Sequence, residues 1–104
     1  MIQPPKIVLV IDDDQDFQMI LKVSLNQSGF QVRSLFDGEI APTFQQEPFP
    51  DLILLDVDLP RANGVEVGKQ LKSNACTRDI PVIMVSANPY VDELCREAGA
   101  IDYV

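Results

Sequence analysis

The sequence lacks histidine, is poor in basic residues, and has no hydrophobic run longer than a strand. Without histidine, Cys–His or Ser–His catalysis and histidine-containing zinc sites are excluded within this chain. Eight Lys and Arg stand against sixteen Asp and Glu, which gives a net charge of −8. So acidic a balance argues against binding of nucleic acid or of an anionic membrane by this segment.

Cysteine is also scarce, and its placement is uninformative about chemistry. Cys76 and Cys95 have neither metal-ligand spacing nor a CxxC arrangement, so we interpret them as reduced thiols of a cytoplasmic protein. Residues 1–6 lack the features of a signal peptide, and the apolar runs are too short to span a bilayer. With 104 residues, 46% of them hydrophobic, the chain has the size and composition of one soluble globular domain.

Short apolar runs alternate with amphipathic stretches, which is the pattern of βα units around a parallel sheet. Expected strands lie at residues 6–11, 30–35, 52–56 and 81–85, with a fifth beginning at 102. Expected helices lie at residues 14–27, 39–46, 64–73 and 90–98. The second helix should be short or irregular, because Pro42 fits only a first turn. The apolar run 52–55 predicts a strand buried on both faces.

The first expected helix has clear signals at both ends. Asp14 should be its N-cap rather than a metal ligand, and Gly29 should stop it. Its apolar face is expected to hold Phe17, Ile20, Leu21 and Leu25. No helix follows the fifth strand, so the sheet face that carries the first helix should expose apolar surface.

Acidic residues follow two of the expected strands. Asp12, Asp13 and Asp14 come directly after the first, while Asp56 ends the third and Asp58 lies two residues further on. If these strands are parallel neighbours, the acids meet at the carboxyl edge of the sheet, where α/β proteins place their ligands. Because converging carboxylates repel one another, the sequence implies a bound cation.

Four motifs in the right order resemble the receiver domain of two-component response regulators. They are Asp12-Asp13, DVDLPRANG at 56–64, Ser86-Ala87, and GAIDY at 99–103. Each is modest alone, but together they are highly specific and cover essentially the whole chain. The resemblance implies one receiver domain at 1–104 with a flavodoxin-like or CheY-like α/β fold. Such a fold is a three-layer, doubly wound, five-stranded parallel sheet of order 2-1-3-4-5.

The resemblance also implies a phosphoryl-transfer site. Asp56 would accept a phosphoryl group from a histidine kinase or a histidine phosphotransfer protein. Asp13 would bind Mg²⁺ or Mn²⁺ directly, Asp12 would act largely through a water, and the Asp58 backbone carbonyl would complete the protein ligands. Such a domain is a phosphoacceptor in signalling rather than an enzyme, catalysing at most its own phosphorylation and dephosphorylation.

Switch residues follow from the same resemblance. The Ser86 hydroxyl and the Ala87 N–H would contact the attached phosphoryl group. The Tyr103 ring would move with Ser86 and change the surface formed by the helix at 90–98 and the fifth strand. An effector domain or protein would respond to that change.

The chain departs from the family pattern in three respects. It stops before the lysine that the family places after the fifth strand, the stretch 86–99 is slightly short, and Asp58 adds a carboxylate beside the acceptor. We expect Asp58 and Asn88 to tune the rate at which water removes the phosphoryl group. We also expect the chain to be the N-terminal part of a longer protein. This fragment should be poorly stable, or should dimerise or swap segments to cover its sheet.

Two other functions fit part of the pattern. A DxD after an apolar strand occurs in aspartate-nucleophile hydrolases of the haloacid dehalogenase type, although the residues that follow and the short chain fit poorly. The second is a receiver-like interaction module that is never phosphorylated. Retention of the acids and the hydroxyl argues against it: Asp12, Asp13, Asp56 and Ser86.

Overall fold

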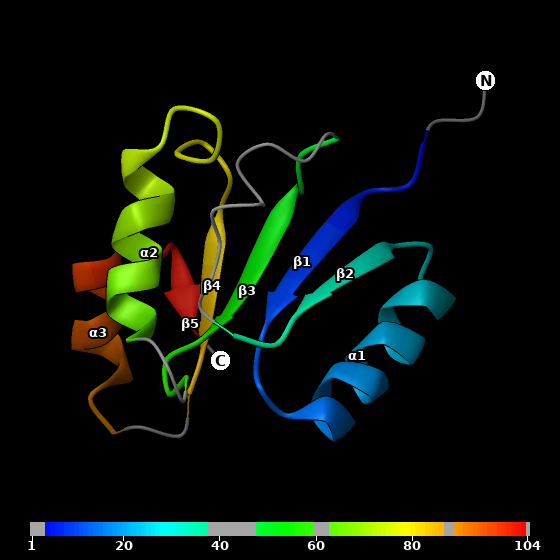
Figure 1. Ribbon diagram of the computed structural model, residues 1–104, viewed down its shortest axis with the longest axis horizontal. Coiled ribbons are helices and arrows are strands. Elements are labelled where there is room, and N and C mark those ends of the chain that lie inside the picture. The colour runs from blue at the N-terminus through cyan, green and yellow to red at the C-terminus, as the bar shows by residue number, and fades with distance from the viewer. Residues whose placement is uncertain (1–3, 38–47, 60–62, 87–88, 104) are drawn as a thin grey trace.

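The computed structural model describes residues 4–37, 48–59, 63–86 and 89–103 (Figure 1). Its five strands are β1 (Ile7–Ile11), β2 (Gln31–Leu35), β3 (Leu52–Asp56), β4 (Val82–Val85) and β5 (Asp102–Tyr103). Its three helices are α1 (Gln15–Gln27), α2 (Gly64–Ser73) and α3 (Val91–Ala98). All adjacent strands pair in parallel, in the order β2-β1-β3-β4-β5. The predicted sheet is therefore confirmed, whereas the helix expected at 39–46 lies outside the described residues.

The ends of α1 form where the sequence predicted them. The Asp14 side chain caps the helix by accepting hydrogen bonds from the N–H groups of Asp16 (3.0 Å) and Phe17 (3.1 Å). After the helix, Gly29 has a φ of +94°, a left-handed conformation that side chains disfavour. Both termini are thus decided by local sequence.

The direction of the chain along the sheet places the helices in two layers. From β1 the chain passes through α1 to β2 on one side, whereas from β3 it passes through α2 and α3 toward β5 on the other. Because such crossovers are right-handed, opposite directions put α1 on one face and α2 with α3 on the opposite face (Figure 1). The result is the expected three-layer architecture.

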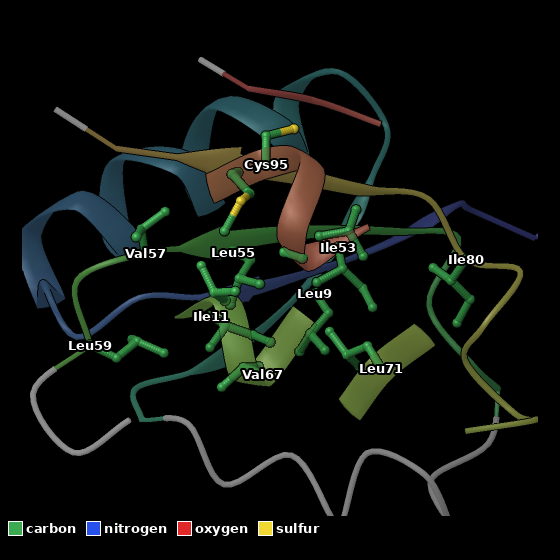
Figure 2. Packing of buried hydrophobic residues seen from close by; sticks show 14 residues of the cluster. Leu9, Ile11, Ile53, Leu55, Val57, Leu59, Val67, Leu71, Ile80 and Cys95 are labelled. Carbon is green, nitrogen blue, oxygen red and sulfur yellow. The ribbon is translucent and has the colours of Figure 1, made fainter. Parts of the chain in front are cut away.

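The face beneath α2 and α3 forms a closed hydrophobic core, which we call the closed face. Alternate strand residues point into it, and helix α2 contributes a matching apolar stripe (Figure 2). Its fully buried members include Ile11, Ile53, Leu55, Leu71 and Met84. Among the residues that the structure describes, most of the large buried side chains gather there, so this face supplies much of the hydrophobic stabilisation.

The opposite face, which we call the open face, is covered only in part. Val8 and Val10 of β1 are buried, but Leu52, Leu54, Ile83 and Val85 of β3 and β4 are half-buried. The prediction that β3 is buried on both faces is therefore wrong for this face, because no helix of the described chain covers the sheet beyond α1.

Helix α1 also exposes apolar side chains on its outer side. Ile20 is 66% exposed, so its assignment to the inward apolar face is wrong, whereas Phe17, Leu21 and Leu25 are half-buried as expected. Met19 and Val23 are exposed beside it. The expected apolar exposure on this side of the molecule is confirmed. Within the described part of the chain, no helix combines the length and apolarity needed to cross a membrane.

Candidate functional site

An acidic cluster lies at the carboxyl edge of the sheet. The register pairs Ile11 with Leu55, so Asp12 and Asp56 follow in equivalent positions on adjacent strands. Together with Asp13 they form a group whose carboxylate oxygens, one from each residue, all lie within 4.8 Å of one another. The sequence predicted this convergence, and the pairing of β1 with β3 produces it.

An open cavity of about 470 Å³ surrounds the cluster. Its lining residues are Asp12, Asp13, Asp14, Phe17, Asp56, Asp58, Val85 and Ser86. The half-buried Ser86 follows β4 and thus lies at the same edge as the acids. The other predicted residues at this end of the strand, Ala87 and Asn88, lie outside the described residues.

The predicted aromatic switch, Tyr103, belongs to β5. Its backbone pairs with Met84, two residues before Ser86, and its side chain lies outside what the structure describes. The backbone position is compatible with the expected neighbourhood of the hydroxyl residue. The role of the ring stays a prediction.

Backbone N–H groups hold the two acid-bearing turns in the same way. The Asp14 N–H donates to Asp12 Oδ1 at 2.9 Å, and the Asp58 N–H donates to Asp56 Oδ1 at 3.0 Å. In each case a carboxylate at the end of a strand accepts from the residue two positions later, which restricts its side-chain rotation. The predicted capping role of Asp14 is confirmed, and its carboxylate also lines the cavity.

Burial and like charges make the cluster costly to ionise. Burial raises the pKa of Asp56 to about 6, helped by the charges of Asp12, Asp13 and Asp58 and opposed by the Asp58 N–H. Burial also raises the pKa of Asp12, which is only 6% exposed, while the Asp14 N–H opposes this and neighbouring carboxylates add to it. The cluster should therefore be stabilised by a bound proton or by a bound cation.

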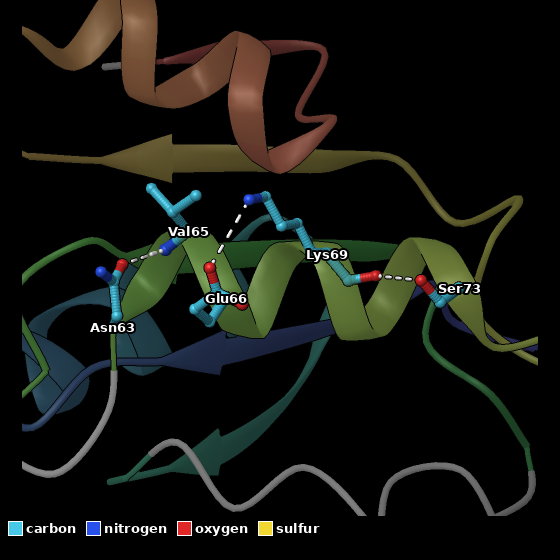
Figure 3. Close-up of polar contacts among 5 residues, drawn as sticks. All are labelled: Asn63, Val65, Glu66, Lys69 and Ser73. Atoms are coloured by element: carbon cyan, nitrogen blue, oxygen red, sulfur yellow. Dashed lines mark hydrogen bonds and ion pairs between the residues drawn. The ribbon is translucent and has the colours of Figure 1, made fainter.

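The first residues of α2 pack tightly against the chain that follows β3. The Asn63 side chain caps α2 by accepting from the Val65 N–H at 2.8 Å (Figure 3). At Gly64 an added Cβ would lie 2.5 Å from the Val57 Cα, so only glycine permits this approach. The predicted opening of α2 at Gly64 is confirmed, with a steric reason that the sequence did not supply.

The donors fit a hard divalent cation. All three clustered ligands are carboxylates, and oxygen is the ligand atom that Mg²⁺ and Mn²⁺ prefer. No basic residue is found among the described residues that line the cavity. The ion pairs Glu66–Lys69 and Asp92–Arg96 lie on exposed helix surfaces, away from the cavity lining. A cation is thus the natural counter-charge for this cluster.

Two residues near the site escaped the sequence analysis. Gln18 is buried behind the acids and donates to three backbone carbonyls, and Phe17, assigned only to the helix face, lines the cavity. The signal for Gln18 was its spacing: it lies three and seven residues before Leu21 and Leu25, so a polar side chain falls on the inward stripe of α1.

The fold and the acidic edge define a doubly wound α/β protein with a cluster of carboxylates at the carboxyl edge of its sheet, and comparisons with known proteins give its family. Residues 8–104 match the family model described as the response regulator receiver domain. The chain is 39% identical over 99 residues to the phosphate regulon transcriptional regulatory protein PhoB of Escherichia coli, covering 93% of this chain and 43% of PhoB. It is 41% identical over 99 residues to the transcriptional regulatory protein PrrA of Mycobacterium tuberculosis, covering 93% of this chain and 42% of PrrA.

A solved structure supports the same conclusion. The Mn²⁺-bound form of the response regulator Rcp1 superposes with a TM-score of 0.81 at 29% identity, covering 96% of this chain and 80% of Rcp1. The chain belongs to the response regulator receiver domain family, the receiver class of two-component signalling proteins. It spans less than half the length of the curated relatives it matches. Receiver domains are signalling domains rather than conventional enzymes, and the fold and family expectations are confirmed.

Proposed function

We propose that Asp56 accepts a phosphoryl group from a phosphohistidine of a histidine kinase or phosphotransfer protein, with a divalent cation bound at the acidic cluster. The observation that carries this proposal is the convergence of Asp12, Asp13 and Asp56 within 4.8 Å in a cavity that also contains Ser86. A carboxylate oxygen of Asp56 forms the new O–P bond while the N–P bond of the phosphohistidine breaks, and the released imidazole takes up a proton.

The ionisation of Asp56 suits this role. With its pKa raised to about 6, the group is largely a carboxylate at neutral pH and is therefore nucleophilic. Its hydrogen bond from the Asp58 N–H directs one oxygen, so the carboxylate presents a restricted orientation to the incoming group.

We assign the cation to Asp13 directly, to Asp12 largely through a water, to Asp56, and to the backbone carbonyl of Asp58. We expect Mg²⁺ or Mn²⁺, and the Mn²⁺-bound state of Rcp1 supports this choice. When bound, the cation neutralises the clustered carboxylates and the charge that develops on the phosphoryl oxygens. The Ser86 hydroxyl and the Ala87 N–H then donate to the phosphoryl group, and Tyr103 follows Ser86 to alter the surface of α3 and β5.

A modification assay tests the acceptor. The chain is treated with acetyl phosphate and Mg²⁺ and separated on a phosphate-affinity gel, with Asp56→Ala as the variant and Asp16→Ala, an exposed acid of α1 outside the cavity, as the matched control. We expect a shifted band in the wild type and in Asp16→Ala and none in Asp56→Ala. No shift in any of the three would favour the interaction module that is never phosphorylated. Turnover of small phosphomonoesters would favour the hydrolase.

We propose further that Asp58 and Asn88 set the lifetime of the aspartyl phosphate. Asp58 lines the cavity two residues from the acceptor, so its carboxylate can repel or orient the water that attacks the phosphoryl group. Asp58→Asn should change the phosphate lifetime severalfold, as measured by the decay of the shifted band. An unchanged lifetime would reject the role of Asp58.

The remaining expectations concern context and assembly. We propose that this receiver works in the cytoplasm and passes its signal to an effector domain or protein. The half-buried open face and the exposed Ile20 support a dimer or a segment exchange that covers this surface. A stable monomer by light scattering would contradict this last proposal.

A further inference from the structure

Gln18 occupies an unusual place in α1. It is 2% exposed and is the buried residue of a helix whose other inward side chains are only half-buried. A polar side chain costs free energy to bury unless it is hydrogen-bonded, so its contacts indicate what keeps it there.

The Nε2 group of Gln18 lies at the junction of three chain segments. It donates to the carbonyl oxygens of Val10 at 2.9 Å, Asp12 at 3.1 Å and Leu35 at 3.2 Å. The Leu35 carbonyl also accepts the Asp12 N–H at 3.0 Å. The peptide groups on both sides of Asp12 are therefore held, one by β2 and the other by Gln18.

The orientation of the amide follows from these contacts. Reversing it would direct Oε1 at three carbonyl oxygens, which repel it, so Nε2 must face them. Among the described residues, Oε1 accepts no hydrogen bond although it is buried. The side chain thus satisfies the carbonyls around the acid-bearing turn and leaves one of its own atoms unsatisfied.

We propose that Gln18 is a positioning residue of the acidic site. By holding the Asp12 carbonyl and the ends of β1 and β2 together, it sets the direction in which Asp12 and Asp13 leave the strand, and hence their convergence on Asp56. Gln18 itself touches no ligand in this scheme. The inference rests on the proposed cation site and explains how its carboxylates are positioned. Residues that support metal ligands from behind commonly control the affinity for the metal.

Two variants and one matched control separate positioning from general stability. Gln18→Met keeps the length of the side chain and removes the donors. Gln18→Glu is nearly isosteric and offers at most one donor proton in place of two. Leu25→Ala truncates a half-buried residue on the same inward face of α1, seven residues further along and outside the cavity.

Affinity for Mn²⁺ is measured on the full chain from the loss of the free Mn²⁺ electron paramagnetic resonance signal, at a temperature where circular dichroism shows each variant folded. We expect Gln18→Met to bind Mn²⁺ about tenfold more weakly than the wild type. Leu25→Ala should lower the melting temperature but keep the wild-type affinity. A loss of affinity in Leu25→Ala equal to that in Gln18→Met would overturn the proposal, since any loosening of α1 would then suffice.

The sign of the Gln18→Glu effect gives a second test, which also serves if Gln18→Met does not fold. If charge alone governed the site, an added carboxylate would tighten Mn²⁺ binding. If instead the hydrogen bonds of Gln18 position the carboxylates, the loss of its N–H donors should weaken Mn²⁺ binding. Binding as tight as in the wild type, or tighter, would overturn the inference while leaving the cation site intact. A wild-type chain that binds no Mn²⁺ would instead overturn the proposed site and this inference with it.

Discussion

The two faces of the sheet are built from the same strands but are buried to different degrees. On the closed face, Ile53 and Leu55 of β3 are fully buried beneath α2 and α3. On the open face, Leu52 and Leu54 of the same strand are only half-buried. Both sets are equally apolar in sequence, so the difference comes from which helices are present to cover them. Apolar character alone therefore does not tell how much a residue contributes to stability.

The largest expected effect is the difference in the free energy of unfolding between truncating a leucine on the closed face and truncating one on the open face. Leu55→Ala should lower the free energy of unfolding by about 2–5 kcal/mol, because it leaves a cavity in a closed core. Leu54→Ala should lower it by about 1 kcal/mol, because solvent already reaches this side chain. Urea denaturation followed by circular dichroism measures both. Equal losses would show that the open face is covered in solution, by a second copy or an exchanged segment.

The acidic cluster at the carboxyl edge of the sheet should change the free energy of unfolding by a smaller amount, and this change should depend on pH. The folded chain holds the Asp56 proton more tightly than the unfolded chain does, because its pKa is about 6 rather than the ordinary 3.8. The stabilisation from this proton is therefore complete below pH 3.8 and is lost as the pH rises to 6. In the absence of divalent metal, the free energy of unfolding should fall over this interval.

Asp56→Asn should remove that part of the pH dependence and be more stable than the wild type above pH 6. Urea midpoints of both proteins, measured in chelator between pH 4 and pH 8, provide the comparison. Added Mg²⁺ should stabilise only the wild type appreciably, since a ligand that binds the folded state raises its stability. Parallel pH curves for the two proteins would show that Asp56 is not perturbed by its surroundings.

The smallest effect on folding is expected on the outer side of α1. Ile20→Gln should change the free energy of unfolding by no more than about 0.5 kcal/mol, because the side chain is already 66% exposed. It should nevertheless weaken self-association if this surface helps to cover the open face. Light scattering over a range of concentrations measures this, with exposed Gln27→Ala of the same helix as a control. A wild type that stays monomeric at every concentration would remove the open face as a dimer surface.

Much of the fold could be predicted because its signals are local. The strands follow from short apolar runs, and the ends of α1 follow from the capping carboxylate of Asp14 and the positive φ of Gly29. The acid site could be predicted because parallel strands must end at a common edge, which brings Asp12 and Asp56 together once β1 and β3 pair.

Other features depend on contacts between distant parts of the chain. By sequence, Ile20 fits an apolar helix stripe as well as Leu21 does. In the structure Leu21 is half-buried, whereas Ile20 is exposed because no described segment covers its side of α1. The spacing of Gln18 places it on the inward stripe of α1, but its three carbonyl partners become known only when β1 and β2 pack beside the helix. The need for glycine at position 64 likewise arises from the approach of α2 to Val57.

The sequence by itself determined the βα alternation, the receiver motifs, and the set of acids and the hydroxyl available for chemistry, because each depends on residue type and short spacing. Only the tertiary structure decided that the carboxylates approach within 4.8 Å, that burial raises the pKa of Asp56 to about 6, and that one sheet face is closed and the other open. These properties arise from distances and solvent exclusion between segments far apart in the chain, which no local pattern records.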